Sequence, residues 1–334
     1  MTSPFPTHSS APSSPHAFSP SDEQRAFFSA LTETRDNLML EASAGSGKTT
    51  TIVEATRRLP SGTTCQFLAF NKNIQTELEA RLPQGVACKT FHAAGLAALG
   101  KLTGASTFSS KVKRAKIDSG KVRAICKDVL PPSAFRLYSS PVCKLVGYAK
   151  SAGLGTTVME DSWSSWQSLF SHFSIQLEDG VTENGVITFA QKVLAESNAR
   201  TDILDFDDML YLALLLNAPF DPFDLTFIDE AQDTNAVQRA LLGRMLTSAN
   251  SAAIRVTPRD ETNYIPEAGG WTKPLPRTAR LIAVGDPQQA IYGFRGADAD
   301  AMTSLRDAFN MRTLPLSVSY RCSRAVVREA QRGF

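Results

Sequence analysis

The chain has 334 residues, of which 43% are hydrophobic and 20% charged, and its formal net charge is +2. This composition suits a soluble globular protein of one large domain or two ordinary ones. So small a net charge is no evidence for nucleic-acid binding, and any basic surface must be local. No apolar run approaches the roughly 18 residues that span a bilayer, so we expect no membrane partner. The expected location is cytoplasmic, on the nucleoid, or in the host cytoplasm if the chain is viral.

The cysteines and histidines do not form a metal-binding pattern. Five cysteines are scattered along the chain without a Cys-x-x-Cys pair, and four histidines are equally dispersed. A structural zinc site needs such residues at close spacing. We therefore expect reduced, buried thiols and no metal cluster.

The first 20 residues contain six serines, five prolines and no charged residue. Such a segment buries too little apolar area to offset its ordering entropy, so we predict a disordered tail. Order should begin near Ser21 or Asp22, either of which can cap a helix that runs through Phe28 to Leu31. Gln24 lies in its first turn. An amide can pair in two directions with an adenine edge, and a solvated helix position is the alternative.

The stretch Glu41–Thr50 reads Glu-Ala-Ser-Ala-Gly-Ser-Gly-Lys-Thr-Thr and follows an apolar run, Leu38–Leu40. A strand, a small-residue loop, Lys-Thr and a helix, in this order, are the layout of a phosphate-binding P-loop. Ala42 stands where the general pattern has glycine. The alternative is a turn rich in glycine and serine.

Four residues of this loop carry the predicted chemistry. Gly45 and Gly47 let the backbone curl so that N–H groups point at phosphate oxygens, and the following helix adds its positive end. Lys48 would reach the β- and γ-phosphates, and the Thr49 hydroxyl would bind Mg²⁺.

After the P-loop helix, strand-like and helical segments alternate. Thr63–Phe70 reads as a buried strand and Val86–Lys89 as a shorter one. This alternation predicts an α/β fold with a parallel sheet flanked by helices. Ligands of such sheets lie beyond the carboxyl ends of the strands, where Asn71, Lys72 and Thr90–His92 fall. These polar residues are candidate nucleic-acid contacts or ordinary loop residues.

From 103 to 201 helical periodicity dominates, which predicts an inserted, mainly α-helical subdomain. Within it, Lys111–Lys127 has seven basic residues and one acidic residue. This segment is either a phosphate-backbone contact or a solvated helix face. We expect Trp163 and Trp166, at helical spacing, to lie in the core.

The apolar run Leu225–Ile228 ends in Asp229 and Glu230. An acidic pair at the end of a strand is costly to bury without a purpose. Asp229 can bind Mg²⁺, directly or through water, beside Thr49. Glu230 can polarise the water that attacks the γ-phosphate. With the P-loop, this pair predicts nucleotide hydrolysis.

A long irregular loop at 250–279 precedes a further core strand, Leu281–Val284. That strand leads into Gly285–Ala297, which contains a polar amide, two aromatics and an arginine. Such a loop suits a sensor that touches both phosphate and stacked bases. Leu314–Arg321 follows.

Taken in order, these segments resemble the motifs of the UvrD/Rep/PcrA-type superfamily 1 DNA helicases. That family tolerates alanine at the first P-loop position, whereas the spacing around Phe70 differs slightly from the family's pattern. The matching segments are Gln24, Ala42–Thr50, Phe70–Lys72, Thr90–His92, Asp229–Thr234, Gly285–Ala297 and Tyr320–Arg321.

The resemblance implies a RecA-like P-loop NTPase fold, with ATP and Mg²⁺ as cofactors and single-stranded DNA as the partner. In this family ATP hydrolysis drives stepping along DNA, usually 3′ to 5′, in repair and replication. The implied catalytic residues are Lys48, Asp229, Glu230, Gln289 and Arg321. The implied nucleotide contacts are Gln24, Ala44, Gly45, Ser46, Gly47, Lys48, Thr49, Thr50 and Tyr320, with Thr49 and Asp229 binding the metal. The implied DNA contacts are Phe70, Asn71, Lys72, Thr90, Phe91, His92, Tyr292, Phe294 and Arg295.

The resemblance also predicts the domain organisation. Residues 21–102 and 202–321 would form the ATP-binding core around the insert at 103–201. The family's second RecA-like domain should follow, but only the 13 residues 322–334 remain after Arg321. We therefore expect the N-terminal half of a helicase, which is truncated, split, or completed by a second polypeptide.

Two other functions stay open at this point. A regulatory module could use ATP as a switch for DNA binding without ever stepping. A P-loop kinase is disfavoured, because the acidic pair and the Gln289 loop serve attack by water and no phosphoacceptor site is evident.

Overall fold

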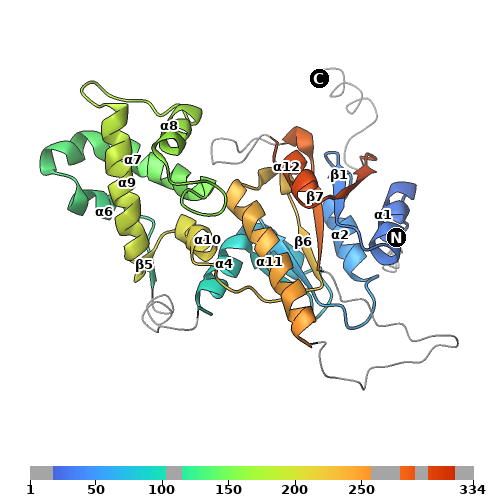
Figure 1. Cartoon of the computed structure of the whole chain (residues 1–334). Coiled ribbons are helices and arrows are strands. Elements are labelled where there is room, and N and C mark those ends of the chain that lie inside the picture. The colour runs from blue at the N-terminus through green and yellow to red at the C-terminus, as the bar shows by residue number, and fades with distance from the viewer. Residues whose placement is uncertain (1–17, 103–114, 257–278, 290–299, 320–334) are drawn as a thin grey trace, which may run out of the picture.

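The computed structural model describes residues 18–102, 115–256, 279–289 and 300–319. Its centre is a six-stranded sheet in the order β3-β2-β6-β7-β1-β8, in which every neighbouring pair is parallel. The predicted parallel sheet flanked by helices is confirmed (Figure 1). The strands are β1 (Leu38–Ala42), β2 (Cys65–Ala69), β3 (Ala87–Thr90), β6 (Leu225–Ile228), β7 (Arg280–Gly285) and β8 (Arg312–Leu316).

Alternate residues of each central strand face opposite sides of the sheet, so both faces are apolar. In β1, Leu38 and Leu40 belong to one hydrophobic cluster and Met39 to the other. Phe67 of β2 lies opposite Phe227 of β6, and their rings stack at 4.8 Å between centroids. The sheet is therefore a layer between two cores.

Different helices cover the two faces of the sheet. One cluster includes side chains of α1 (Asp22–Glu33), α2 (Lys48–Thr56) and α3 (Lys72–Glu79). The other includes side chains of α4 (Phe91–Leu99), α10 (Phe206–Leu215), α11 (Ala236–Val256) and α12 (Ala301–Ala308). Short strands joined by helices in this way bring the loops after β1, β2, β3, β6 and β7 to one edge.

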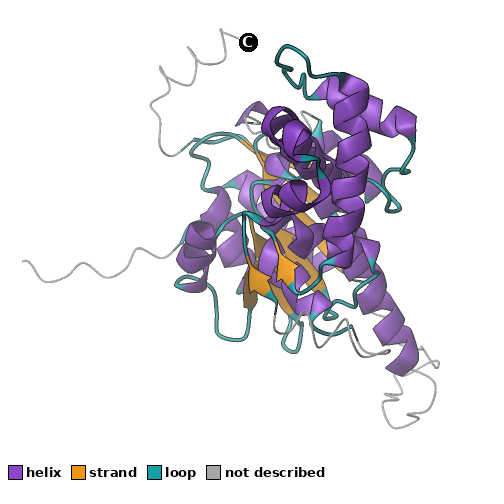
Figure 2. Cartoon of the chain, turned by 90° about the vertical axis from the view of Figure 1, so that its left-hand side faces the viewer, coloured by secondary structure: helices purple, strands orange, loops and turns teal. Residues whose placement is uncertain are grey.

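Four helices between the core segments form a separate group beside the sheet (Figures 1 and 2). They are α6 (Lys121–Val129), α7 (Pro132–Ala152), α8 (Trp163–His172) and α9 (Glu183–Ala199). The short strands β4 (Lys116–Ile117) and β5 (Ile203–Leu204) come before and after these four helices in the sequence, and they pair with each other in parallel. The exact domain limits stay a prediction.

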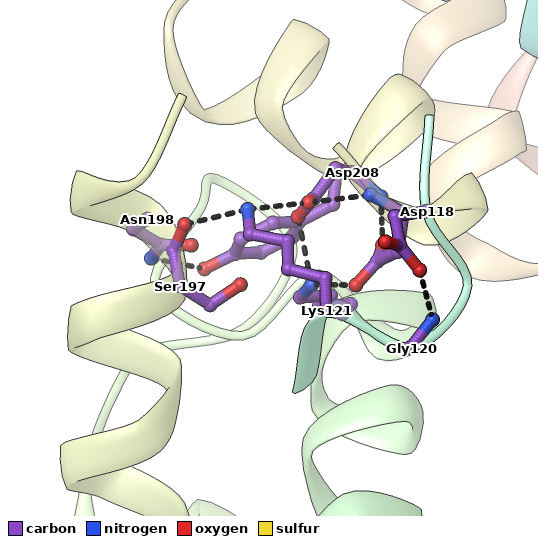
Figure 3. Close-up of polar contacts among 9 residues, drawn as sticks. Asp118, Gly120, Lys121, Ser197, Asn198 and Asp208 are labelled. Atoms are coloured by element: carbon purple, nitrogen blue, oxygen red, sulfur yellow. Dashed lines mark hydrogen bonds and ion pairs between the residues drawn. The ribbon is translucent and has the colours of Figure 1, made fainter. Parts of the chain in front are cut away.

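A buried cluster of four charged side chains joins this helical group to α10. Asp205 and Asp208 form a reciprocal capping box at the start of α10. Lys150 Nζ lies 2.6 Å from Asp205 Oδ2 and 2.7 Å from Asp208 Oδ1, and Lys121 Nζ lies 2.7 Å from Asp208 Oδ2. Figure 3 shows Lys121 reaching between Asp208 and Ser197, whose backbone carbonyl accepts a second hydrogen bond. We name these four residues the Lys–Asp cluster.

The structure corrects two expectations about which side chains are exposed and which are buried. Lys121, within the basic segment predicted to touch phosphate or solvent, is only 3% exposed because it belongs to the Lys–Asp cluster. Residues 111–114 of that segment lie outside the described residues. Trp166 is fully buried, as expected, but Trp163 is 40% exposed and its expected core position is wrong. It occupies the first position of α8, whose inward face is formed by Trp166, Leu169 and Phe170.

The four described cysteines carry free thiols, which agrees with the expected reduced state. Cys322 and the predicted disordered tail, apart from residues 18–20, lie outside the described residues. None of the helices in the described part of the chain combines the length and the apolar character that crossing a membrane requires.

Candidate nucleotide and nucleic-acid site

The loop after β1 has the conformation of a phosphate cradle. Gly45 and Gly47 have φ values of 74° and 80°, the left-handed region that favours glycine. Helix α2 begins at Lys48, and no side chain caps its first N–H groups. The Ser46 hydroxyl is fully buried and has no hydrogen-bond partner among the described residues. Uncapped N–H groups at a helix N-terminus, with a hydroxyl beside them, form a site for an anion such as phosphate.

The predicted acidic pair lies directly against this loop. Glu230 Oε2 is 3.2 Å from Lys48 Nζ, and the Thr49 hydroxyl donates a hydrogen bond to Asp229 Oδ2 at 3.4 Å. Burial, together with the charge of Glu230, raises the pKa of Asp229 to about 6. A hydroxyl and a buried carboxylate that converge in this way are hard oxygen ligands suited to a divalent cation.

The described residues offer no second site for a metal ion. Among the described residues, no group of three or more His, Cys, Asp or Glu side chains is arranged to hold a metal. A cation held by Thr49, one carboxylate, phosphate oxygens and water does not need such a group.

Glu230 has a strained backbone, with φ 52° and ψ 48°. A non-glycine residue in this left-handed region costs of order 1–3 kcal/mol, and such residues gather at functional sites. Lys48 holds its carboxylate from one side, and the Gln232 side-chain amide donates to the same oxygen at 2.8 Å. With this backbone conformation, the Glu230 carboxylate faces the P-loop.

A chain of hydrogen bonds continues from Glu230 to the loop after β7. Gln232 Oε1 accepts a hydrogen bond from the Asp286 backbone N–H at 3.1 Å, and Asp286 Oδ2 accepts one from Gln289 Nε2 at 2.6 Å. Gly285 leaves room for this contact, since a Cβ there would lie 2.6 Å from Gln232 Oε1 and the amide would have to shift. The structure thus brings Gln289 to the same place as the P-loop.

These groups surround one cleft of about 420 Å³, which we call the P-loop cleft. Arg81 and Glu77 of the α3 end also line it, and sequence reasoning missed both. Arg81 donates a hydrogen bond to the Thr50 hydroxyl at 2.8 Å. Only its basic character could have drawn attention to it. The predicted residues that line the cleft are Ala44, Gly45, Ser46, Gly47, Lys48, Thr49, Thr50, Glu230 and Gln289.

Gln24 is not among the residues that line the P-loop cleft. It is 3% exposed, and its amide bonds within the protein. Its Oε1 accepts from the Ser21 N–H at 2.9 Å and its Nε2 donates to the Thr51 hydroxyl at 2.8 Å. In this conformation Gln24 fastens α1 to α2, so contact with adenine stays a prediction.

A second cleft, of about 510 Å³, lies between the loops after β2 and β3 and helix α7; we call it the α7 cleft. Phe70, Asn71 and His92, three of the predicted DNA contacts, line it. Burial lowers the pKa of the His92 ring below its ordinary value. The cleft is also lined by Cys143, Lys144, Tyr148, Asp207 and Asp233.

Three further predicted DNA contacts do not line this cleft. The Thr90 hydroxyl caps α4 by accepting from the Ala93 N–H at 3.1 Å, and Lys72 donates to Gln75 at 3.2 Å. Phe91 is 1% exposed and packs in the core. The Phe91 ring anchors α4 in this core, and contact of Phe91 with DNA stays a prediction.

Phe206 is a surface aromatic that sequence reasoning missed. Its side chain is 56% exposed, and its ring lies edge-on to His92 at 6.2 Å between centroids. A phenylalanine between Asp205 and Asp207 at the first position of a helix was the available signal, since such a position is normally solvent-facing. Its exposed ring is suited to stacking on a base.

Five predicted site residues lie outside the described residues. They are Tyr292, Phe294, Arg295, Tyr320 and Arg321.

Comparison with known proteins identifies the family to which this chain is similar. A sequence model described as the UvrD/REP helicase N-terminal domain matches residues 21–310. The F-box DNA helicase protein 1 of Schizosaccharomyces pombe is 25% identical over 300 residues, which are 88% of this chain and 30% of that protein. DNA helicase II of Escherichia coli is 25% identical over 333 residues, covering 92% of this chain and 39% of its own length. The RecBCD enzyme subunit RecB of Mycobacterium tuberculosis is 29% identical over 157 residues, covering 43% and 12%.

Proposed function

Because this chain belongs to the UvrD/REP helicase family, we propose that it hydrolyses ATP in the P-loop cleft and couples hydrolysis to single-stranded DNA in the α7 cleft. The chain spans less than two fifths of the length of the relatives named above. The activity of a whole helicase is therefore proposed by analogy with them.

One observation carries the coupling. The three-residue 3-10 helix η1 (Ala231–Asp233) begins directly after Glu230, which lines the P-loop cleft, and ends at Asp233, which lines the α7 cleft. Gln232 bonds to Glu230 on the nucleotide side, whereas Asp233 lines the α7 cleft with Asn71 and His92. A displacement of Glu230 when γ-phosphate leaves would move a turn that is shared with the DNA side.

The residues of the P-loop cleft divide the chemistry between them. Backbone N–H groups and Lys48 would neutralise the β- and γ-phosphates and hold the transferred group in line. Glu230 would orient the attacking water and accept its proton. Thr49 and Asp229 would hold Mg²⁺, which supplies charge stabilisation at the phosphate oxygens when it is bound.

The DNA side would use both ring stacking and polar contacts. Phe206 and Phe70 offer rings, while Asn71 and Lys144 offer donors for the backbone and the base edges. We further propose 3′-to-5′ stepping, with a second RecA-like domain closing on the P-loop cleft. That domain would come from the same polypeptide or from a partner.

The test measures steady-state ATP hydrolysis with and without a single-stranded oligonucleotide. We expect DNA to stimulate hydrolysis, and Lys48→Ala to reduce it to background while leaving the fold intact. Lys101→Ala is the matched control, because Lys101 is a surface lysine paired with Asp221. If ATP binds and changes DNA affinity but DNA leaves the hydrolysis rate unchanged, the chain is an ATP-switched DNA-binding module and the coupling proposal fails.

A further inference from the structure

Two cysteines of the helical group lie in direct contact. Cys126 is on α6 and Cys143 is on α7, and their sulfur atoms are 3.6 Å apart. Both are free thiols. A disulfide requires about 2.0 Å between the sulfurs, so a movement of less than 2 Å separates this contact from a covalent bond. Neither residue has a part in the proposed hydrolysis.

The two thiols differ in how a reagent can reach them. Cys126 is fully buried, whereas Cys143 is half-buried and lines the α7 cleft. The hydrogen bond between the two thiols, with a smaller effect from the Arg123 charge, holds the pKa of Cys143 below its ordinary value. The same hydrogen bond, together with burial, raises the pKa of Cys126. Cys143 is thus the accessible thiol with the lowered pKa, and Cys126 is the buried thiol behind it.

We propose that Cys126 and Cys143 form a reversible redox dithiol site, at which Cys143 takes a small-molecule disulfide and Cys126 resolves it to an intramolecular disulfide.

The reaction balances with oxidised glutathione as the oxidant. The Cys143 thiolate attacks one glutathione sulfur, forms a mixed disulfide and releases one glutathione thiolate. Cys126 then loses its proton, attacks the Cys143 sulfur and displaces the second glutathione thiolate, and both released thiolates take up protons. Two protein thiols are oxidised and one glutathione disulfide is reduced to two thiols. Reduced glutathione or dithiothreitol reverses the steps.

The bond would close a short loop. Residues 126 and 143 are 17 positions apart and belong to helices that follow one another through Leu130 and Pro131. Cross-linking such a loop restricts the unfolded chain. We therefore expect the oxidised protein to unfold at a temperature a few degrees higher than the reduced protein.

The test incubates the whole chain with oxidised glutathione, then alkylates it and maps its peptides without reduction. The expected product is two hydrogens lighter than the reduced chain and contains one linked peptide pair, 126 with 143. Cys126→Ser should instead stop at one stable glutathione adduct on Cys143. Cys88→Ser is the matched control and should leave the reaction unchanged. Cys88 is also half-buried, but burial and the nearby Glu79 raise its pKa to about 11.

The proposal is overturned if the wild-type chain keeps both thiols alkylatable, or if its disulfide joins other cysteines. Mapping of the wild-type chain decides this even if Cys126→Ser fails to fold. A second measurement adds a single-stranded oligonucleotide before the oxidant. Severalfold slower oxidation is expected if DNA occupies the α7 cleft, which rests on the proposed function. An unchanged rate would count against DNA in that cleft and leave the dithiol chemistry standing.

Discussion

Asp208 offers the sharpest test of how the helical group is held to the core. Its carboxylate lies 2.7 Å from both Lys121 Nζ and Lys150 Nζ, and both the carboxylate and the two ammonium groups are within 1% of full burial. Substitution with Asn keeps the shape of the side chain but removes its charge. Two buried ammonium groups then share the single carboxylate of Asp205.

The expected cost follows from burial. Breaking a buried ion pair by removing one partner costs about 3–5 kcal/mol, because it leaves an uncompensated charge. Asp208 faces two cations, so we expect Asp208→Asn to lower the free energy of unfolding by about 5 kcal/mol. Typical domains have only about 5–15 kcal/mol in total. Urea unfolding followed by circular dichroism measures the loss.

A double-mutant cycle isolates the electrostatic part. Adding Lys121→Met to Asp208→Asn leaves Lys150 paired with Asp205, and the cluster is neutral again. We expect the double variant to be more stable than Asp208→Asn alone, with a coupling energy of at least about 2 kcal/mol between the two positions. If the two substitutions add to within about 0.5 kcal/mol, the buried charges are not coupled and the reasoning is refuted.

Three further predictions concern the core, the α7 cleft and catalysis. Gly95→Ala should lower the free energy of unfolding by about 1–3 kcal/mol, because a Cβ there would lie 2.2 Å from the Met209 carbonyl oxygen. Gly243→Ala is the control, because no atom lies nearer than 3.8 Å to a Cβ there. It should leave the free energy of unfolding in urea unchanged or raise it. Burial, with smaller effects from neighbouring carboxylates, raises the pKa of Asp207 to about 6. The wild type should therefore lose stability as pH rises from about 4 to about 6, and Asp207→Asn should be more stable at pH 7 by up to about 3 kcal/mol; parallel pH profiles of the two proteins would contradict this. Glu230→Gln should slow ATP hydrolysis by about 10²–10⁴ while a fluorescent ATP analogue still binds, and an unchanged rate would exclude Glu230 as the base.

The P-loop and the acidic pair could be predicted from sequence because their signals are local. Gly45 and Gly47 are needed for left-handed backbone, and Lys48 follows them at the start of a helix. Asp229 and Glu230 end an apolar strand, and the carboxyl ends of parallel strands share one edge. Their meeting with the P-loop therefore follows once a parallel sheet is inferred.

The positions of single side chains could not be predicted in the same way. Phe91 and Gln24 each lie among polar residues of a predicted motif, yet both side chains are buried. Phe91 is buried because α4 packs on α10, and Gln24 is buried because α1 packs on α2. Lys121 is read from sequence as part of a basic surface, but the partner that buries it, Asp208, lies 87 positions away. Phe206 is exposed although Asp205 and Asp208, which flank it in the same helix turn, are held inward by the Lys–Asp cluster.

The sequence by itself therefore predicted the parallel sheet, the order of its motifs, and the positions of the P-loop and the acidic pair. Hydrophobic periodicity and glycine backbone preferences act over a few residues, so they can be read without knowing what packs against them. Tertiary structure decided which polar and aromatic side chains face solvent, that η1 links Glu230 in the P-loop cleft to Asp233 in the α7 cleft, and that Cys126 meets Cys143. These depend on contacts between segments far apart in the chain, where burial and charge pairing are set by the neighbour and not by the residue itself.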